Sequence, residues 1–317
     1  MKVVVIYTSQ TGNTEKIALA IQRGVKQITG QCDIFTMKEA NPRGLSGYDL
    51  IGIGSPTEGS KEPGWVDAFI KSLRFIGGKH NFIFSTHGTL PANYVASLVP
   101  RLKDKGLVVI GWRDWYGGGN HAQYPGPWFT EGHPDKIDLD EAEAYGREMV
   151  ERSVRISRGE PGLIPEPPAL IDFGELAPDK VFRDVRPVRD FAKFYKDKCL
   201  YPACRLCMDN CPWDGIDLTV DPPVLHQPCT YCGGLCEALC PTGAIDWTEF
   251  RAHPVKDVTP EGKGHIEELG VPTLKEAEAE GRFRRLISEE AVRSFTIPPG
   301  YYDKHPRFII GQGRVPG

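Results

Sequence analysis

Eight of the nine cysteines in this chain of 317 residues lie between residues 199 and 241. They form two runs that both end in a Cys-Pro pair: Cys199, Cys204, Cys207, Cys211 and Pro212, then Cys229, Cys232, Cys236, Cys240 and Pro241. Thiolates bind iron strongly, and several thiolates on a tight loop can surround one face of an iron–sulfur cube. The doubled run therefore predicts two [4Fe-4S] clusters.

Two other kinds of cysteine site fit this pattern poorly. A disulfide framework is typical of short secreted domains, whereas this chain is long and we expect no export signal in it. A structural zinc site needs two Cys pairs separated by a longer loop. The ninth cysteine, Cys32, stands apart at the start of an expected strand, where we expect a buried structural thiol.

Strands and helices alternate through residues 1–158. The apolar runs predict strands at residues 3–7, 33–37, 49–54, 81–86 and 107–112. Apolar residues at helical spacing predict helices at residues 14–27, 66–73, 92–105 and 137–157. Five strands joined by crossover helices indicate an α/β fold with a five-stranded, parallel, doubly wound sheet.

The loop after the first strand, residues 8–14, is rich in hydroxyl groups and opens a helix. Hydroxyls and backbone N–H groups at a helix N-terminus form a phosphate site. The loop has neither the Lys of a P-loop nor the three glycines of a dinucleotide fingerprint. This pattern suits a monophosphate such as FMN, although Asn13 or Thr14 alone would also explain it as a helix cap.

Residues 10–14, Gln-Thr-Gly-Asn-Thr, resemble the phosphate motif of flavodoxins, whose sheets bind FMN at the switch between strands 1 and 3. The resemblance implies that residues 9–14 hold the FMN phosphate and that the loops after strands 3 and 4 border the isoalloxazine. The cofactor residues it implies are Ser9, Gln10, Thr11, Gly12, Asn13, Thr14, Pro56, Thr57, Glu58, Gly59, Thr86, His87 and Gly88. Aromatic residues for stacking on the flavin, or for the core alone, are Trp65, Tyr94, Trp112, Trp115 and Tyr116.

The cysteine runs resemble those of bacterial two-cluster ferredoxins, C-x2-C-x2-C-x3-C-P, although the gaps here are 4, 2, 3 and 2, 3, 3. A turn and a short strand are expected after each Cys-Pro pair, at residues 213–216 and 242–245. In such ferredoxins the fourth Cys of one run ligates the other cluster. The resemblance therefore implies one cluster on Cys199, Cys204, Cys207 and Cys240, and a second on Cys229, Cys232, Cys236 and Cys211.

The order of these parts resembles flavodoxin–ferredoxin fusion proteins. We expect a flavodoxin-like FMN domain, a stiff Pro-rich connector, a small α+β ferredoxin-like domain with two clusters, and a C-terminal extension, at residues 1–158, 159–195, 196–250 and 251–317. The extension is expected to contain a helix at residues 274–294. Its apolar side chains should dock on the same chain or on a second copy in a homodimer.

The resemblance implies a low-potential electron carrier that passes electrons between two [4Fe-4S] clusters and FMN. Its partners would be redox proteins: a ferredoxin or other low-potential donor, and an acceptor enzyme. Two alternatives stay open, an FMN-dependent reductase of a small molecule fed by the clusters and a dedicated activator of a metal or corrinoid enzyme. No catalytic residue is assigned, and Gly52-Ile53-Gly54 lacks the third glycine of a nicotinamide site.

Composition limits the partners and the location that we expect for the protein. The chain has 38 Lys and Arg residues against 42 Asp and Glu residues, a net charge of −4, so nothing indicates nucleic acid or an anionic membrane as a partner. No apolar run approaches the length of a membrane span. Cysteines assigned to clusters fit a cytoplasmic, low-oxygen location.

Overall fold

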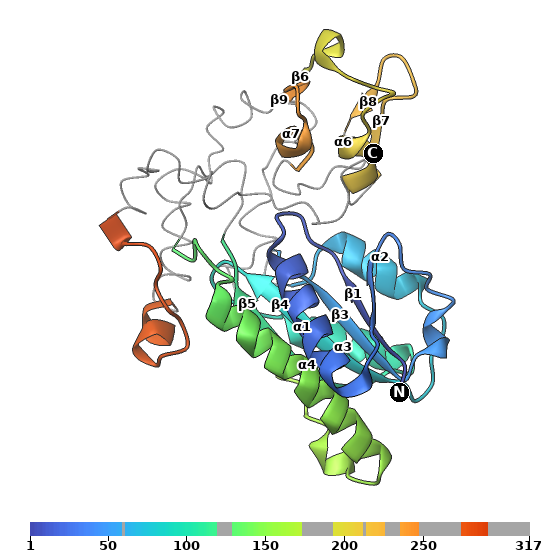
Figure 1. The fold of residues 1–317 in the computed structure, drawn as a ribbon, viewed down its shortest axis with the longest axis vertical. Helices are drawn as coiled ribbons and strands as arrows, with labels where there is room; N and C mark the ends of the chain where they lie inside the picture. Colours follow the sequence, from blue (N-terminus) through green and yellow to red (C-terminus); the bar gives the residue numbers. More distant parts are fainter. Residues whose placement is uncertain are drawn as a thin grey trace.

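The computed structural model describes residues 1–58, 61–118, 129–172, 193–211, 214–225, 235–246 and 274–290. Its largest element is a sheet of five strands in the order β2-β1-β3-β4-β5 (Figure 1). All neighbouring strands are parallel. The strands are β1 (Val3–Tyr7), β2 (Asp33–Thr36), β3 (Leu50–Pro56), β4 (His80–His87) and β5 (Val108–Tyr116). The expected α/β class and its parallel, doubly wound sheet are confirmed.

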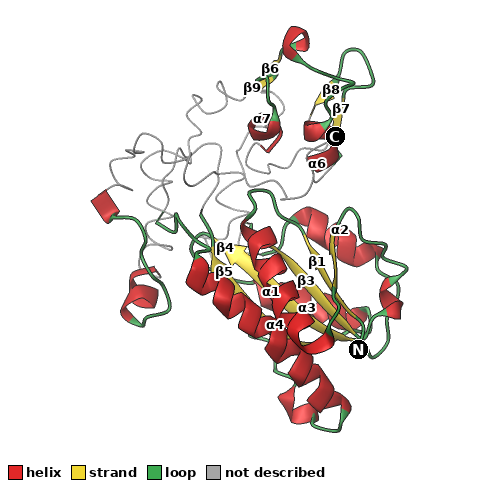
Figure 2. Cartoon of the chain, viewed as in Figure 1, coloured by secondary structure: helices red, strands yellow, loops and turns green. Residues whose placement is uncertain are grey.

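Helices cover both faces of this sheet (Figure 2). One face packs against α1 (Asn13–Thr29) and α4 (Lys136–Ser157), which lie side by side, and the other against α2 (Gly64–Ser72) and α3 (Tyr94–Asp104). Strand β1 is buried on both faces, which explains its continuous apolar sequence. Val5 packs in the core beside α1 and α4, and Val4 packs in the core beside α2 and α3. A strand buried on both faces has no polar alternation.

Two glycines in β3 serve the packing of the sheet. A Cβ on Gly52 would overlap the ring of Phe82, and one on Gly54 would overlap the ring of Phe84, both on the neighbouring strand β4. The pair thus leaves room for two large rings in the core. Cys32, the ninth cysteine, is buried as expected.

The structure differs from the sequence-based expectation at two places. Strand β5 continues to Tyr116, beyond the expected end at residue 112, because residues 113–116 pair with the last four residues of β4. The continuous helix expected at residues 274–294 is wrong. The helix ends at residue 279, Gly281 follows with a φ of 71°, and the N–H groups of Arg282 and Phe283 donate back to the Ala277 carbonyl. Glycine at positive φ ends a helix in this way.

The described residues 193–211, 214–225 and 235–246, here called the cysteine-rich unit, contain short elements. β6 (Lys193–Phe194) pairs antiparallel with β9 (Ile245–Asp246), and β7 (Ile216–Asp217) with β8 (Val224–Leu225). The helices are α6 (Leu206–Asn210) and α7 (Leu235–Leu239). The predicted residues Gly59, Cys229 and Cys232, together with most of the connector and much of the extension, lie outside the described residues.

Three short 3₁₀ helices complete the described elements: η1 (Leu45–Gly47), η2 (Pro161–Leu163) and η5 (Lys196–Lys198). Of the helices in the described part of the chain, none is both long and apolar enough to cross a membrane.

Candidate functional site

The phosphate loop and α1 meet at Gly12, which has a φ of 84° and is the N-cap of the helix. Its N–H donates to Ser9 Oγ at 3.1 Å, and its carbonyl accepts from Lys16 N at 2.9 Å. No side chain caps the helix at this end, so the explanation of Asn13 or Thr14 as a simple cap does not hold. The first N–H groups of a helix have no partner within it, and they attract anions.

Asn13 and Thr14 instead tie the loop to other strands. Asn13 Nδ2 donates to the Gly118 carbonyl beyond β5 at 3.0 Å. The hydroxyls of Thr14 and Thr86 share a buried hydrogen bond of 2.8 Å, and the Thr86 carbonyl accepts from Thr57 N, also at 2.8 Å. The loops that follow β1, β3, β4 and β5 therefore form one continuous surface, which we call the carboxyl edge.

Three buried polar atoms on the carboxyl edge have no hydrogen-bond partner in the described part of the chain: Gln10 Nε2, Thr57 Oγ1 and His87 Nδ1. Gln10 and Thr57 lie in the loops after β1 and β3, and His87 is the last residue of β4. Buried polar atoms are nearly always hydrogen-bonded in native proteins. FMN carries donors and acceptors along its ring, ribityl chain and phosphate, so these residues fit that group.

Glu58 adds a titratable group to the same edge. Its backbone pairs with that of Lys61 through hydrogen bonds of 2.8 and 3.1 Å. Burial raises the pKa of the Glu58 carboxyl to about 8, although the nearby Gln10 side chain opposes the rise. The carboxyl is therefore mostly neutral at pH 7, and a neutral carboxyl can donate a hydrogen bond.

His87 is the last residue of β4, and its ring contacts two residues of β5. Its Nε2 lies 2.9 Å from Asp114 Oδ2 on β5, and its ring is 4.7 Å from the ring of Tyr116. Burial favours the neutral Asp114, but the hydrogen bond and charge of His87 and the nearby Arg113 and Arg282 hold its pKa below the ordinary value. Sequence reasoning missed Asp114 because it expected β5 to end at residue 112.

The aromatic candidates for flavin stacking are mostly core residues. Trp65, Tyr94 and Trp115 are buried, and the Tyr94 hydroxyl shares a hydrogen bond with Ser55 Oγ at 2.8 Å. Trp112 packs against the core beside α2 and α3. Tyr116 lies between His87 and Phe283, whose ring is 4.8 Å away.

The cysteine-rich unit brings thiols of both runs together. Cys199, Cys204 and Cys207 of the first run and Cys240 of the second line one pocket. The rest of its lining is largely apolar: Phe194, Leu200, Leu206, Leu218, Pro241, Thr242, Ala244 and Ile245. Four sulfurs in an apolar pocket could hold a [4Fe-4S] cluster. These are the four residues that the ferredoxin resemblance groups together, including Cys240 from the second run.

Backbone N–H groups point at the sulfurs in matching positions of the two runs. Gly215 N donates to Cys211 Sγ at 3.2 Å, and Ala244 N donates to Cys240 Sγ at 3.1 Å. Donor and acceptor are four residues apart in both cases. Hydrogen bonds to cluster sulfurs are among the features that set a cluster's potential. Cys211 and Cys240 therefore receive equivalent backbone hydrogen bonds.

The thiols of the pocket are close enough to affect one another. Burial, and then the charges of Cys240, Cys199 and Cys204, raise the pKa of Cys207 to about 11. Burial also favours the thiol form of Cys240, but the N–H groups around it hold its pKa below the ordinary value. Cys236 is buried in the core of the same unit, and Cys211 packs against this core. Because Cys229 and Cys232 are outside the described residues, the second set of four stays a prediction.

Among the described residues, Lys38 joins the segment after β2 to the cysteine-rich unit. Lys38 Nζ lies 2.7 Å from Asp214 Oδ1 and donates to the Asp209 carbonyl at 3.3 Å. Lys38 follows β2, and the residue before it, Met37, donates its N–H to the Tyr7 carbonyl at 2.7 Å, just before the phosphate loop. In Figure 1 the cysteine-rich unit lies above the end of the sheet where β1 leads into α1.

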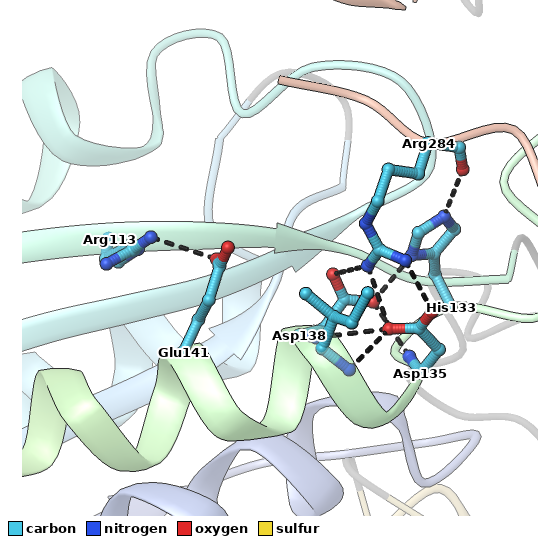
Figure 3. Close-up of polar contacts among 7 residues, drawn as sticks. Arg113, His133, Asp135, Asp138, Glu141 and Arg284 are labelled. Atoms are coloured by element: carbon cyan, nitrogen blue, oxygen red, sulfur yellow. Dashed lines mark hydrogen bonds and ion pairs between the residues drawn. The ribbon is translucent and has the colours of Figure 1, made fainter. Parts of the chain in front are cut away.

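A group of His133, Asp135 and Asp138 has the donor atoms for a metal ion, all within 4.8 Å of one another (Figure 3). Arg284 already supplies the positive charge there. Its guanidinium donates to Asp135 at 2.5 and 2.8 Å and to Asp138 at 2.8 Å. His133 bridges Asp138 Oδ2 and the Arg284 carbonyl at 2.6 and 2.7 Å. The group therefore anchors the extension to the start of α4.

Apolar contacts complete this anchor. Leu274, Ala277 and Phe283 form a small core with Phe129, against which Tyr116 packs. The described part of the extension thus docks on its own chain, one of the two arrangements expected for it.

The sequence matches the flavodoxin domain family over residues 4–105. It is 30% identical to a flavodoxin of Megasphaera elsdenii over 112 residues, which are 34% of this chain and 82% of that protein. It is 43% identical to an uncharacterised ferredoxin of Methanocaldococcus jannaschii over 49 residues, or 15% of this chain and 77% of that protein. A solved flavodoxin from the domain Archaea matches with a TM-score of 0.40 and 20% identity, over 49% of this chain and 99% of that one.

Proposed function

Because the N-terminal part of the chain belongs to the flavodoxin family, we propose that FMN on the carboxyl edge exchanges electrons with two [4Fe-4S] clusters in the cysteine-rich unit. The chain would then be a carrier between redox proteins, with the flavin in residues 1–158 and the clusters in residues 196–250. When bound, the clusters supply one-electron chemistry and FMN supplies one- or two-electron chemistry.

The observation that carries the proposal is the pocket lined by Cys199, Cys204, Cys207 and Cys240. Its thiols come from both cysteine runs, which is the ligand arrangement of bacterial two-cluster ferredoxins. We assign the second cluster to Cys211, Cys229, Cys232 and Cys236. The similarity to a ferredoxin of M. jannaschii supports the assignment.

The chain's own residues have distinct roles in the cluster sites. The N–H groups of Gly215 and Ala244 stabilise negative charge on Cys211 and Cys240. The apolar lining, with Leu218 and Ile245, keeps water away from the sulfurs. Both features influence the reduction potential of a cluster.

In the flavin site, the start of α1 and the Ser9–Gly12 turn receive the phosphate. Gln10, Thr57 and His87 offer buried polar atoms to the rest of the cofactor. Glu58, neutral at pH 7, can approach the flavin without placing a negative charge beside it. Gly59, assigned to the same loop, belongs to this proposal on the flavodoxin resemblance alone.

The contact of Lys38 with Asp214 supports electron exchange within one chain. Asp214 N donates to the Cys211 carbonyl at 3.2 Å, so the lysine contacts the turn that carries a proposed cluster ligand. On the other side, the Lys38 segment is bonded to the end of β1. The clusters and the flavin would therefore lie at the same end of the sheet.

Metal and flavin analysis of anaerobically reconstituted protein tests the proposal. We expect about eight irons, from two cubane clusters, and one FMN per chain. An EPR-monitored redox titration of the same sample should report both kinds of centre. Zinc in place of iron, about four irons at full reconstitution, or FAD in place of FMN would contradict the proposal.

A further inference from the structure

The two ends of the cysteine-rich unit have different surroundings. Lys38 contacts the turn that carries Cys211, through Asp214 and the Asp209 carbonyl. In Figure 1 the paired strands β6 and β9 lie at the end of the unit far from the sheet. The Cys211 turn is therefore on the side of the unit that meets the chain's own N-terminal part.

The opposite end is open to solvent. Residues 196–205 include Cys199 and Cys204, both half-buried, and most of the side chains around them are exposed. Leu200 is 51% exposed, yet it also lines the pocket of Cys199, Cys204, Cys207 and Cys240. An apolar side chain at the rim of this pocket gives a partner a short approach to the sulfurs.

Basic side chains outnumber acidic ones in the segment around Leu200, in contrast to the net −4 of the whole chain. Residues 193–205 carry four basic side chains and one acidic side chain: Lys193, Lys196, Lys198 and Arg205, against Asp197. Lys198 Nζ lies 4.2 Å from the centroid of the Tyr195 ring, a contact that leaves its charge uncompensated. Lys196 and Arg205 pair with Asp221 and Asp209 at 2.7 and 3.4 Å in exposed positions. Such pairs are weak and solvated.

We propose that residues 196–205 are the docking surface for an acidic redox protein. This inference rests on the proposed function. The partner's reduced centre loses one electron, the cluster on Cys199, Cys204, Cys207 and Cys240 gains it, and no bond forms or breaks. A cationic rim around an exposed leucine favours this occupant, because complementary charge speeds encounter and the apolar centre excludes water.

The test uses the complete holoprotein and a reduced, small, acidic two-cluster ferredoxin as the probe, mixed in anaerobic stopped flow. Lys198→Glu should lower the second-order rate constant at low salt by about two- to fivefold, the range of one exposed ion pair. It should also flatten the dependence of this rate on ionic strength. Lys196→Glu is a second variant with the same expectation, and reduction by dithionite should be unchanged in both.

Lys103→Glu is the matched control, because it makes the same charge change at the exposed last turn of α3. Equal slowing by Lys198→Glu and Lys103→Glu would overturn the docking surface, since only net charge would then matter. Unchanged rates in both variants of residues 196–205 would overturn it as well. Iron and FMN at parental levels in those samples would leave the proposed function standing. Parent protein without iron would refute both.

Discussion

The hydroxyl pair of Thr14 and Thr86 offers a test that separates stability from cofactor binding. The two side chains are buried, and their oxygens are 2.8 Å apart. One of the two hydroxyl hydrogens makes this bond, which leaves the other for a ligand. The perturbation is Thr14→Val, Thr86→Val and the double variant, because valine replaces the hydroxyl with a methyl group of similar size.

The expected magnitudes follow from this geometry. Either single change leaves the partner hydroxyl buried without its bond, which should cost about 1–3 kcal/mol of unfolding free energy. Removing both hydroxyls should cost much less than the sum of the single changes. The double variant still lacks the one hydrogen available to FMN. A loss of about 0.5–1.5 kcal/mol per hydrogen bond corresponds to a ~2- to 13-fold higher Kd.

Urea unfolding of the apoprotein and anaerobic titration with FMN, followed by flavin fluorescence, measure the two quantities. Thr29→Val is the control, because the Thr29 hydroxyl donates to the Val25 carbonyl at the far end of α1. It should leave the Kd for FMN unchanged. A folded double variant that binds FMN with parental affinity would refute the assignment of this loop.

Three further predictions concern other parts of the account. Because burial raises the Glu58 pKa from 4.5 to about 8, the folded apoprotein holds a proton there that the unfolded chain releases. Stability should therefore fall by up to about 1.4 kcal/mol per pH unit between those values, and Glu58→Gln should flatten this fall in urea unfolding at several pH values. Cys240→Ala should damage the cluster of the first cysteine run; EPR showing loss of only the other cluster would contradict the crossing. Lys38→Glu should slow flavin–cluster exchange about two- to fivefold, and adding Asp214→Lys should restore it, as flash photolysis can show.

Apolar patterning was sufficient to predict the sheet because its central strands are buried on both faces. Val3–Tyr7 and Leu50–Pro56 are apolar runs bounded by polar loops, so their positions were clear. The end of β5 was not predicted, because Arg113 and Asp114 are polar and exposed. They belong to the strand only because they pair with β4. The helix at residues 274–294 was overextended because helical spacing alone does not weigh the glycine at residue 281.

The candidate site was likewise predicted only in part. The ferredoxin resemblance implied a cluster on Cys240 with Cys199, Cys204 and Cys207, and these four residues line one pocket in the structure. Contacts between residues far apart in sequence have no motif that would predict them. Lys38 and Asp214 are 176 residues apart in sequence, and neither belongs to a motif. His87 was identified through its loop, but its partner Asp114 came only from the register of β4 and β5.

The most direct test of the central claim is laser flash photolysis of the complete, reconstituted protein under anaerobic conditions. A pulse reduces one kind of centre, and the flavin and cluster absorbance bands are then followed at several protein concentrations. If FMN and the clusters exchange electrons within one chain, the redistribution is first order and its rate constant does not depend on protein concentration. A rate proportional to concentration, or no redistribution in protein that contains both cofactors, would contradict the account.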